Sequence, residues 1–579
     1  MHASLSLALT GSGGAGVMTA GQLLLDAAAS AGFYGLMARS FGPQIRGGEA
    51  AALLRLATAP VETPDDAYRL LIALDWGNIE RFADELPLAA GALVIADPGQ
   101  GPVPAVMAGQ AVQVLEVPLA ALAASVPGGR ANMVALGLGA GLAGVPAAAL
   151  EQTLVAALAR HGEPLVRAAL ACSAAGQREA ARLAAEVGLD PLPAPPPAAK
   201  ERWALNGNEA TGFGALQAGL RFCAAYPITP ATEILEWLAP NLARVGGRLV
   251  QAEDELASIN MCLGASYGGV ASLTATSGPG LSLMIESLGL AVAAELPVVV
   301  VNVMRGGPST GIPTKSEQTD LNIAVYGLHG EAPHVVVAPT GVGDCLATAG
   351  WALTLAEHLQ TPVIMLSDQA IGQTRTVVDA PAIGQHSEPA RRLAAADGYR
   401  RYALTEDGIS PMSLPGTPGL QYTADGLTHG ESGTPSTRAA DHVAQLDKRR
   451  RKLESHDYGH RWAELEGAGP LALITWGSAT GPAREACRRA AAMGVEVRLI
   501  ALRLIAPLPA TQLTHALAGV TAALVVEHNH SGQLYRHLRG WTELPALTLP
   551  WHRPGPLPLR PAEILEALLR LERSLETAA

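Results

Sequence analysis

Four short apolar runs in the middle of the chain constrain its fold more than any other feature. They are Val270–Ala275, Pro297–Met304, His334–Ala338 and Pro362–Leu366, and stretches with helical periodicity separate them. Runs of this length, apolar on both faces, are typical of parallel strands that are buried between two layers of helices. The pattern therefore predicts an α/β fold built on a parallel sheet.

The composition and length support the same class. Hydrophobic residues make up 49% of the chain, charged residues 16% and aromatic residues only 4%. Alanine, glycine, leucine and valine therefore supply most of the core, and small residues let helices lie close on parallel strands. At 579 residues the chain is too long for one hydrophobic core, so we expect several domains.

A proline-rich segment gives the clearest boundary. Five of the first seven residues of 191–200 are prolines, and such a segment is expected to be stiff, extended and unable to join a core. The unit before it opens with a strand at Ser4–Leu9, a glycine loop and a helix rich in alanine and leucine. A less regular stretch at Tyr399–Glu431 interrupts the α/β rhythm further on. We expect three α/β domains at 1–190, 201–385 and 466–579, a linker at 191–200 and a connecting segment at 386–465.

The last of these domains again contains apolar runs that predict strands, at Leu471–Trp476, Val495–Leu502 and Ala522–Glu527.

Charge and cysteine usage narrow the class of function. The net charge of −12 argues against a general nucleic-acid binder, which normally carries a basic face. The five cysteines are scattered and form no C-x-x-C pair, so a zinc or iron–sulfur site within this chain is not expected. They also fit a reducing cytoplasm. The N-terminal residues lack the basic region of a signal peptide and run into a glycine loop.

Two segments could be mistaken for partner sites. Met133–Leu150 is uncharged over 18 residues, but alanine is its commonest residue and it contains four glycines and Pro146, so a buried strand, turn and helix are expected rather than a membrane span. The run Leu446–Glu454 holds five consecutive basic residues. A solvated helix face is favoured over a nucleic-acid or targeting patch, because acidic residues flank the run.

The glycine loop near the N-terminus follows a strand and opens a helix. Such a loop lets the backbone approach a phosphate, while the helix N-terminus supplies N–H donors. Dinucleotide binding also requires an acidic residue about 20 positions later, and the stretch from residue 31 onward contains none before Glu49. A loop that contacts another phosphate or packs tightly is therefore favoured over an NAD site, and Arg46 in a second glycine cluster suits an anion. The loop glycines are Gly11, Gly13, Gly14 and Gly16.

Five unusual strings follow the proline-rich segment in order. They are GNEATGFGALQAG (Gly207–Gly219), AYPITPATE (Ala225–Glu233), QAEDELASINMCLGAS (Gln251–Ser266), TATSGPGLSLM (Thr274–Met284) and GPSTGIPTKSEQTDL (Gly307–Leu321). This ordered set resembles the fused gamma–alpha subunit of the 2-oxoacid:ferredoxin oxidoreductase family, of the 2-oxoglutarate type. The resemblance covers nearly the whole chain. It implies a gamma-type domain, a thiamine pyrimidine-binding domain and a transketolase-C-like domain.

The resemblance also implies where the chemistry lies. Thiamine diphosphate needs a carboxylate in a dry site next to its aminopyrimidine, and Glu255 matches the family's catalytic glutamate. Thr229 is the position that reaches the 2-oxoacid, while Thr314 and Lys315 match the place where relatives hold the substrate carboxylate. Lysine there supplies a point charge where some relatives have the fork of arginine. The remaining cofactor-binding candidates are Tyr226, Pro227, Ser277 and Gly278.

Half of a thiamine site is missing from the sequence. The G-D-G string and the later Asn pair that hold Mg²⁺ and the diphosphate in this enzyme class do not occur. The resemblance implies that a separate beta subunit binds the diphosphate, Mg²⁺ and a [4Fe–4S] cluster, with two alpha and two beta subunits as the natural assembly. The implied reaction is the oxidative decarboxylation of a 2-oxoacid, with coenzyme A taking the acyl group and ferredoxin the electrons.

Other interpretations stay open at this point. The chain could be an NAD-dependent dehydrogenase, another thiamine enzyme component, or a non-catalytic relative that keeps the fold. Within the family, fused chains with P-T-K-x-E-Q most often resemble 2-oxoglutarate enzymes, and pyruvate or branched-chain 2-oxoacids are alternatives.

Overall fold

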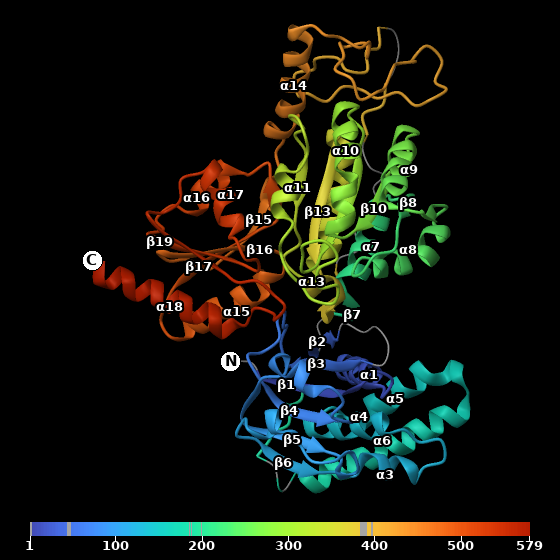
Figure 1. The fold of residues 1–579 in the computed structure, drawn as a ribbon, viewed down its shortest axis with the longest axis vertical. Helices are drawn as coiled ribbons and strands as arrows, with labels where there is room; N and C mark the ends of the chain where they lie inside the picture. Colours follow the sequence, from blue (N-terminus) through green and yellow to red (C-terminus); the bar gives the residue numbers. More distant parts are fainter. Residues whose placement is uncertain are drawn as a thin grey trace. The chain divides into compact units, whose positions relative to one another are not determined.

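The computed structural model describes residues 3–42, 48–184, 186, 188–197, 200–381, 391–394 and 398–578. The chain divides into two compact units (Figure 1). Unit 1 comprises Met1–Asn206, Gln373–Ala382 and Arg560–Ala562, and unit 2 comprises Gly207–Gly372, Ile383–Leu559 and Glu563–Ala579. The described residues form one eight-stranded sheet in unit 1 and a seven-stranded and a five-stranded sheet in unit 2. The expected α/β class is confirmed.

The sheet of unit 1 is mixed, in the order β6-β5-β4-β1-β3-β2-β14-β7. The pairs from β6 to β1 in this order are parallel, and the pairs from β1 to β7 are antiparallel. The predicted first strand is confirmed as β1. The strands are β1 (Ser4–Ser12), β2 (Tyr34–Phe41), β3 (Glu49–Ala57), β4 (Tyr68–Ala73), β5 (Leu88–Ala96), β6 (Gln113–Glu116), β7 (Arg202–Asn206) and β14 (Arg375–Asp379).

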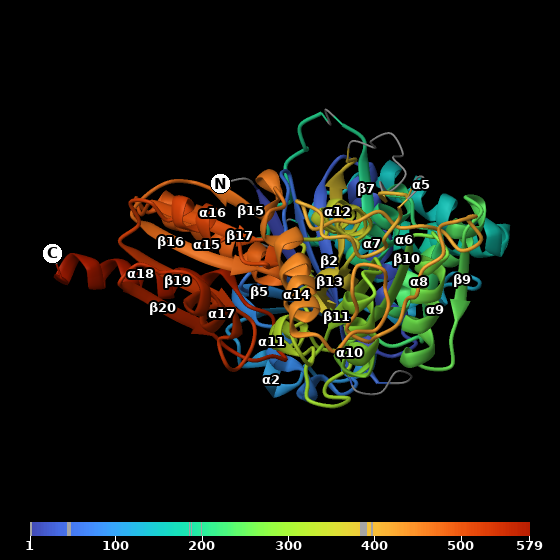
Figure 2. The same ribbon diagram turned by 90° about the horizontal axis from the view of Figure 1, so that it is seen from above.

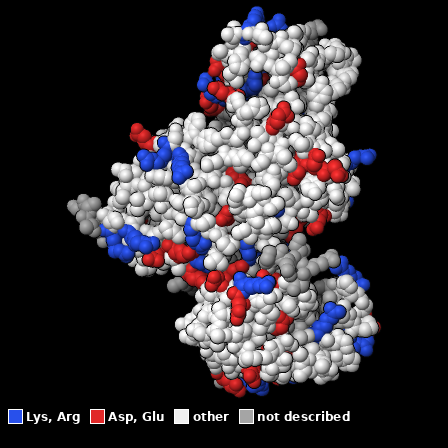
Figure 3. Space-filling model, in the orientation of Figure 1, with Lys and Arg blue, Asp and Glu red and all other residues white. Residues whose placement is uncertain are grey.

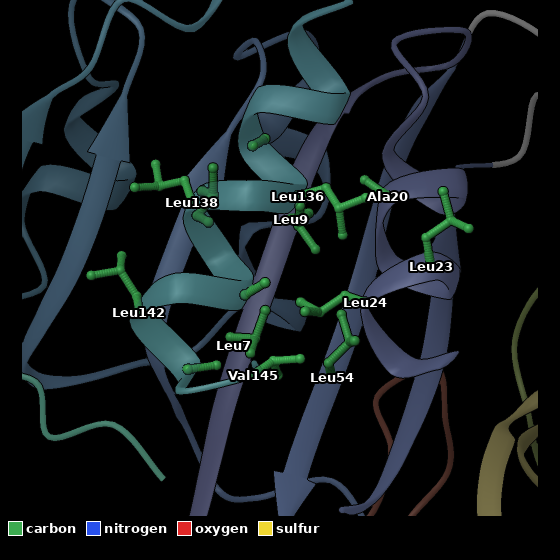
Figure 4. Packing of buried hydrophobic residues seen from close by; sticks show 14 of the residues in the cluster. Leu7, Leu9, Ala20, Leu23, Leu24, Leu54, Leu136, Leu138, Leu142 and Val145 are labelled. Atoms are coloured by element: carbon green, nitrogen blue, oxygen red, sulfur yellow. The ribbon is translucent and has the colours of Figure 1, made fainter. Parts of the chain in front are cut away.

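Leucines and alanines from several helices and strands fill the core of unit 1. Figure 4 shows α1 and α4 packing side chains such as Leu24 and Leu136 against Leu7, Leu9 and Leu54 of the sheet. The helices of this unit are α1 (Val17–Ser30), α2 (Ala105–Ala108), α3 (Leu119–Ala124), α4 (Ala131–Ala143), α5 (Ala147–Leu158) and α6 (Glu163–Leu183).

The strand expected at the start of Met133–Leu150 is wrong, because this stretch forms most of α4, a turn and the start of α5. The glycines that break a helical pattern in the sequence are contact points here. A Cβ on Gly137 would collide with the carbonyl of Ser173, and one on Gly176 with the carbonyl of Val134. Helices α4 and α6 can therefore lie backbone to backbone, which repays the cost of glycine in a helix.

The proline-rich linker was also expected to stay outside any core, and this is wrong for its first residues. Leu192 belongs to the buried cluster of unit 1, and its N–H donates to the carbonyl of Ala143 at 3.1 Å. Gly144, with φ at 81°, brings the chain close enough for this contact at the end of α4. Prolines thus extend the backbone here without preventing the leucine between them from being buried.

Unit 2 contains the parallel sheet that the four central apolar runs predict. The order is β18-β12-β13-β11-β10-β8-β9, and every pair is parallel except β12 with β18. The four runs form β10 to β13, offset from the expected ends by a few residues at most. The strands are β8 (Phe222–Ala225), β9 (Arg248–Gln251), β10 (Ser272–Thr276), β11 (Val298–Met304), β12 (Val335–Val337), β13 (Pro362–Asp368) and β18 (Leu504–Ala506).

Helices cover both faces of this sheet. Figure 2 shows α7 and α12 on one side of it and α9 and α10 on the other. Both faces of the central strands are therefore buried, which is the reason that their sequences are continuous apolar runs. The helices are α7 (Gly207–Gln217), α8 (Thr232–Arg244), α9 (Glu255–Tyr267), α10 (Gly278–Ala293), α11 (Leu321–Tyr326), α12 (Asp344–Leu359) and α13 (Gln369–Gln373).

The second sheet of unit 2 has the order β15-β17-β16-β19-β20. Helices α15 and α18 lie on one face and α16 and α17 on the other (Figure 1). We call residues 463–559 and 563–578 the C-terminal module; its β18 pairs with β12 and joins it to the seven-stranded sheet. Its elements are β15 (Ala463–Glu466), β16 (Leu471–Trp476), β17 (Val497–Leu502), β19 (Ala522–Glu527), β20 (Leu547–His552), α15 (Thr480–Ala492), α16 (Ala510–Ala516), α17 (Gln533–Trp541) and α18 (Pro561–Ala578).

The basic run Leu446–Glu454 lies on α14 (Ala439–Glu454), but it is not a solvated face. Lys448 and Lys452 are buried, and their ammonium groups bond to the two carboxylate oxygens of Glu295 at 2.7 and 3.2 Å. Burial favours the neutral acid, yet the two lysines and Arg401 hold the pKa of the Glu295 carboxyl below its usual range. Two of the five basic residues of the run therefore bind α14 to Glu295 in the body of unit 2.

Charged side chains are sparse on the surface. On the face shown in Figure 3, lysine and arginine alternate with acidic residues in small groups among mostly uncharged residues. Across the described part of the chain, no helix is both long enough and apolar enough to span a membrane.

Candidate active site

Parallel strand order brings the unusual sequence strings together. The strings containing Thr229, Glu255 and Ser277 follow β8, β9 and β10, and the string containing Lys315 follows β11. Since these strands are parallel neighbours, their carboxyl ends lie at one edge of the sheet. We call this the carboxyl edge of unit 2. Ligands of open α/β sheets bind outside such an edge, which makes it the candidate site.

Glu255 is the first residue of α9, as the sequence predicted. Asp254 caps the helix, accepting a hydrogen bond from the N–H of Ala257 at 2.7 Å. Glu255 is 7% exposed, whereas Glu253 is exposed. A Cβ on Gly280 would lie 2.7 Å from Glu255 Cγ and 2.8 Å from its Oε1. The carboxylate therefore lies across the first turn of α10, in a position that only a glycine there permits.

The neighbouring Ser277 and Gly278 form the N-terminus of α10. Ser277 is fully buried, and its hydroxyl has no hydrogen-bond partner among the described residues. A Cβ on Gly278 would lie 2.7 Å from a carboxylate oxygen of Asp320, so this turn also has no room for a side chain. A buried hydroxyl with an unused donor beside a helix N-terminus is suited to a polar ligand.

The turn after β8 is more exposed. Tyr226 is 41% exposed, Thr229 is also exposed and Pro227 is half-buried. Pro230 anchors the turn, because its carbonyl accepts a hydrogen bond from Asn208 Nδ2 at 2.8 Å. The Thr229 side chain is therefore open to a ligand, while its backbone is held.

Thr314 and Lys315 lie in the loop between β11 and α11, residues 305–320, which we call the β11–α11 loop. Both are half-buried. The Lys315 carbonyl accepts from the N–H of Gly306 at 2.9 Å, and the Thr314 carbonyl accepts from Gln369 Nε2 at 2.7 Å. Hydrogen bonds thus hold the backbone of Thr314 and Lys315 to the residues that follow β11 and β13.

Two residues at this edge were missed in the sequence. Arg305 directly follows β11, is 7% exposed and donates from Nη1 to the Thr229 carbonyl at 2.6 Å. Its Nε has no partner among the described residues, and burial lowers the pKa of its guanidinium. Asp320 accepts from Asn302 Nδ2 at 2.9 Å, and burial raises the pKa of its carboxyl. The available signal was position, since Arg305 precedes the string that follows β11 and Asp320 lies near the end of that string.

The glycine loop of unit 1 borders a separate pocket of about 570 Å³. Gly13, Gly14 and Gly16 line it together with Arg130 and Asn132, whereas Gly11 lies within β1. Gly16 has φ of 85°, and a Cβ on it would collide with Asn132 Nδ2, so glycine is required at this N-cap. Arg46 lies outside the described residues.

Among the described residues, no group of three or more histidine, cysteine, aspartate or glutamate side chains could hold a metal ion.

Comparison with known proteins identifies the family. Residues 213–448 match the thiamine-diphosphate-binding model of pyruvate flavodoxin/ferredoxin oxidoreductases, residues 6–179 the pyruvate ferredoxin/flavodoxin oxidoreductase model, and residues 470–544 core domain II of pyruvate:ferredoxin oxidoreductase. The 2-oxoglutarate synthase subunit KorA of Methanothermobacter thermautotrophicus is 34% identical over 385 residues, which cover 64% of this chain and 100% of that protein. The chain belongs to the 2-oxoacid:ferredoxin oxidoreductase family.

Other members of the family extend the match. The 2-oxoglutarate oxidoreductase subunit KorA of Mycobacterium tuberculosis is 39% identical over 350 residues, which are 58% of this chain and 52% of that protein. The aligned region thus spans about half the length of that relative. The solved structure of the 2-oxoglutarate:ferredoxin oxidoreductase of Magnetococcus marinus, with 2-oxoglutarate, coenzyme A and succinyl-CoA bound, matches with a TM-score of 0.90 and 34% identity, over 98% of this chain and 99% of that one.

These matches confirm the resemblance inferred from the five strings. They also set aside the NAD-dependent dehydrogenase, because the region that contains the glycine loop matches the oxidoreductase family model.

Proposed function

We propose that this chain is the alpha subunit of a thiamine-diphosphate-dependent 2-oxoacid:ferredoxin oxidoreductase that oxidatively decarboxylates 2-oxoglutarate and transfers the succinyl group to coenzyme A. The observation that carries the proposal is the buried Glu255 carboxylate at the carboxyl edge, lying against Gly280 beside the unpartnered hydroxyl of Ser277. Pyruvate and branched-chain 2-oxoacids are the alternative substrates.

The residues at the carboxyl edge fit the pyrimidine half of thiamine diphosphate. Gly280 lets the Glu255 carboxylate lie against the first turn of α10, the Ser277 hydroxyl, without a partner among the described residues, has a donor to give, and Tyr226 and Pro227 offer flat surfaces from the turn after β8. The cofactor supplies a nucleophilic carbon and an electron sink when bound. The buried Glu255 carboxyl group would hold a proton and share it with the aminopyrimidine of the cofactor, in a site from which burial excludes water.

The cations of the edge support 2-oxoglutarate. A 2-oxoacid presents one carboxylate next to the keto group, and 2-oxoglutarate presents a second one further away. Arg305, with its unused Nε near Thr229, is placed to bind the first, and the Thr229 hydroxyl to contact the keto acid. Lys315 and Thr314 then bind the distal carboxylate. Two cations for two carboxylates favour the dicarboxylic acid over pyruvate.

The pocket of unit 1 supports coenzyme A binding. Gly13, Gly14 and Gly16 bring the backbone close to the pocket at the N-terminus of α1, and Arg130 adds a cation at the N-terminus of α4. Such a combination suits the phosphates of coenzyme A. Arg46 is a further candidate for the same role.

A second subunit completes the proposed enzyme. The chain has no G-D-G string and no Asn pair, so a beta subunit is proposed to hold Mg²⁺, the diphosphate and a [4Fe–4S] cluster, and to pass electrons to ferredoxin. We propose a cytoplasmic complex of two alpha and two beta subunits.

The test is an assay of the complex as it exists. The chain is purified anaerobically from its native cells with the subunits it retains, and viologen reduction is measured with coenzyme A and 2-oxoglutarate, pyruvate or 2-oxoisovalerate. Coenzyme-A-dependent reduction that is fastest with 2-oxoglutarate, in a complex with an iron–sulfur subunit, is expected. Reduction with pyruvate alone would refute the substrate, and no reduction with any of the three would refute the function.

A further inference from the structure

One glutamine of the β11–α11 loop has a contact pattern that the proposed chemistry does not use. Gln318 lies three residues after Lys315 and is fully buried. Its backbone N–H donates to the His528 carbonyl at 2.7 Å, and its Oε1 accepts from the His528 N–H at 2.8 Å. Its Nε2 donates to the Trp476 carbonyl at 2.8 Å. Its own carbonyl accepts from Asn529 Nδ2 at 3.2 Å. All four polar groups of this residue therefore bind the C-terminal module.

The C-terminal module is shaped to receive this side chain. Gly477, which follows Trp476, has φ of 57°, and a Cβ on it would lie 2.5 Å from Gln318 Nε2. A residue other than glycine would therefore push the amide out of its site and would be strained in this conformation. The contact therefore requires both Gln318 on the β11–α11 loop and Gly477 on the C-terminal module.

The turn that carries His528 and Asn529 is itself rigid. Glu527, at the end of β19, is fully buried and accepts hydrogen bonds from Asn529 Nδ2 at 2.6 Å and from the N–H groups of Leu534 and Tyr535 at 2.8 and 3.1 Å. Asn529 Oδ1 in turn accepts from the N–H of Gly532 at 2.8 Å. Gln318 is thus bound to a fixed point rather than to a mobile loop.

The residues between Lys315 and Gln318 are held as well. Ser316 Oγ donates to Asp368 Oδ1 at 3.1 Å and accepts from the N–H of Ala370 at 3.1 Å. Glu317 Oε1 accepts from the N–H of Gly555 at 2.6 Å. Three residues of extended chain span about 10 Å at most, so fixing Gln318 limits where the Lys315 ammonium can lie.

We propose that Gln318 is a positioning residue for the 2-oxoacid: the C-terminal module sets the place of Thr314 and Lys315 through this side chain, and substrate affinity depends on the contact. This inference rests on the proposed function, because it takes Lys315 as a substrate ligand. It adds a role for the C-terminal module, which determines the geometry of a substrate contact.

The experiment compares variants of the complete native complex. Gln318→Leu removes both side-chain hydrogen bonds, and Gln318→Glu keeps the acceptor for His528 but places a carboxylate against the Trp476 carbonyl. Gln445→Leu is the matched control, since Gln445 is equally buried in unit 2 and donates to the Tyr402 carbonyl at 3.0 Å, on an element that carries no proposed substrate ligand. The KM for 2-oxoglutarate, the kcat and the thermal midpoint are measured for each.

For Gln318→Leu we expect a KM at least about tenfold higher with kcat changed by less than about threefold, because misplacing a binding group by about 1 Å is costly. Gln318→Glu is expected to lie between the wild type and Gln318→Leu, and Gln445→Leu to lower only the thermal midpoint. An unchanged KM, or equal losses in Gln318→Leu and Gln445→Leu, would overturn the inference.

Two further outcomes are distinct. If Gln318→Leu does not assemble, the KM of Gln318→Glu decides in the same way. If the wild-type complex oxidises no 2-oxoacid, the proposed function fails and this inference fails with it, whereas an active wild type with an unchanged variant KM refutes the positioning role alone.

Discussion

Unit 2 buries charged side chains in two regions, which differ in whether those side chains find their partners within the chain. At the carboxyl edge, Arg305 keeps an unpartnered Nε and Ser277 an unpartnered hydroxyl among the described residues. Beneath α14, each carboxylate oxygen of Glu295 has its own ammonium partner, from Lys448 and Lys452. Lys315 at the edge and the five-residue basic run on α14 both stand out in the sequence.

The difference separates a binding site from a structural contact. A buried polar group without a partner costs free energy unless something supplies one; at an edge where open α/β sheets bind ligands, such a group is a candidate ligand contact. A buried charge that is matched within the chain contributes to the fold and needs no ligand. Variants at the carboxyl edge should therefore reduce activity and leave stability nearly unchanged, and variants beneath α14 should do the reverse.

The largest effect is expected for Glu255→Gln. Removing the proton-transfer group should lower kcat by about 10³-fold, because general acid–base groups contribute about 10²–10⁴. The side chains have the same shape, so the thermal midpoint should stay near that of the wild type. Steady-state viologen reduction and a melting curve measure both. The exposed neighbour variant Glu253→Gln should keep full activity, and a fully active Glu255→Gln complex would refute the assignment.

The next largest effect is expected for Glu295→Gln, which removes the carboxylate that pairs with Lys448 and Lys452 beneath α14. It leaves two buried ammonium groups without a counter-charge, and the free energy of unfolding should fall by about 3–5 kcal/mol. Denaturant unfolding measures this, and activity per folded complex should be unchanged. Asp441→Asn, which breaks an exposed ion pair with Arg438 at the start of α14, should cost little.

The same variant has a pH signature. The lysines hold the pKa of Glu295 below its usual value near 4.5, so its stabilisation is complete above that pH and is lost as the pH falls below it. Wild-type stability should therefore decline in acid more steeply than that of Glu295→Gln. If the stability of both proteins fell equally with decreasing pH, Glu295 would not be the group that causes the loss of stability in acid.

A smaller effect is expected for Arg305→Leu. Losing a charged hydrogen-bond donor to the 2-oxoacid carboxylate should lower kcat/KM by about 100-fold, mainly through KM. Arg305→Lys keeps the charge without the fork and should recover part of the loss. Competition with a dicarboxylate inhibitor measures affinity independently of turnover. Equal kcat/KM in the wild type and Arg305→Leu would remove Arg305 from the site.

The smallest effect concerns His528, at the contact with Gln318. Burial, followed by the nearby Arg553, lowers the pKa of His528 to about 4 from an ordinary 6.5. The unfolded chain therefore takes up a proton first, and stability should fall by about 1–3 kcal/mol as the pH drops from 6.5 to 4. His528→Gln, which does not titrate, should lose less stability over that window. An unchanged pH profile would show that other groups dominate.

Most of the fold could be predicted from the sequence, because its central strands are buried on both faces. Continuous apolar runs gave β10 to β13, β16 and β19 within a few residues of their observed ends. Three expectations failed for physical reasons. The glycines of α4 mark close contact with α6 rather than a helix break, Leu192 is buried despite flanking prolines, and two lysines of the basic run on α14 pair with one distant carboxylate.

Only part of the candidate site could be predicted from the sequence. The strings around Thr229, Glu255 and Lys315 were identified, because parallel strands carry them to one edge. Arg305 was missed, since a single arginine after a strand carries no sequence signal until its Nε is seen to lack a partner. Gln318 was seen in its string without a role, because its partners lie more than 150 residues away in the C-terminal module.

The most direct test of the central claim is the rate at which the complex exchanges the C2 proton of bound thiamine diphosphate for deuterium. This step requires neither coenzyme A nor ferredoxin, and in this account it depends on the carboxylate of Glu255. Quenched-flow NMR should show fast exchange in the wild-type complex and exchange about 100-fold slower in Glu255→Gln. Equal rates in the two complexes would contradict the account.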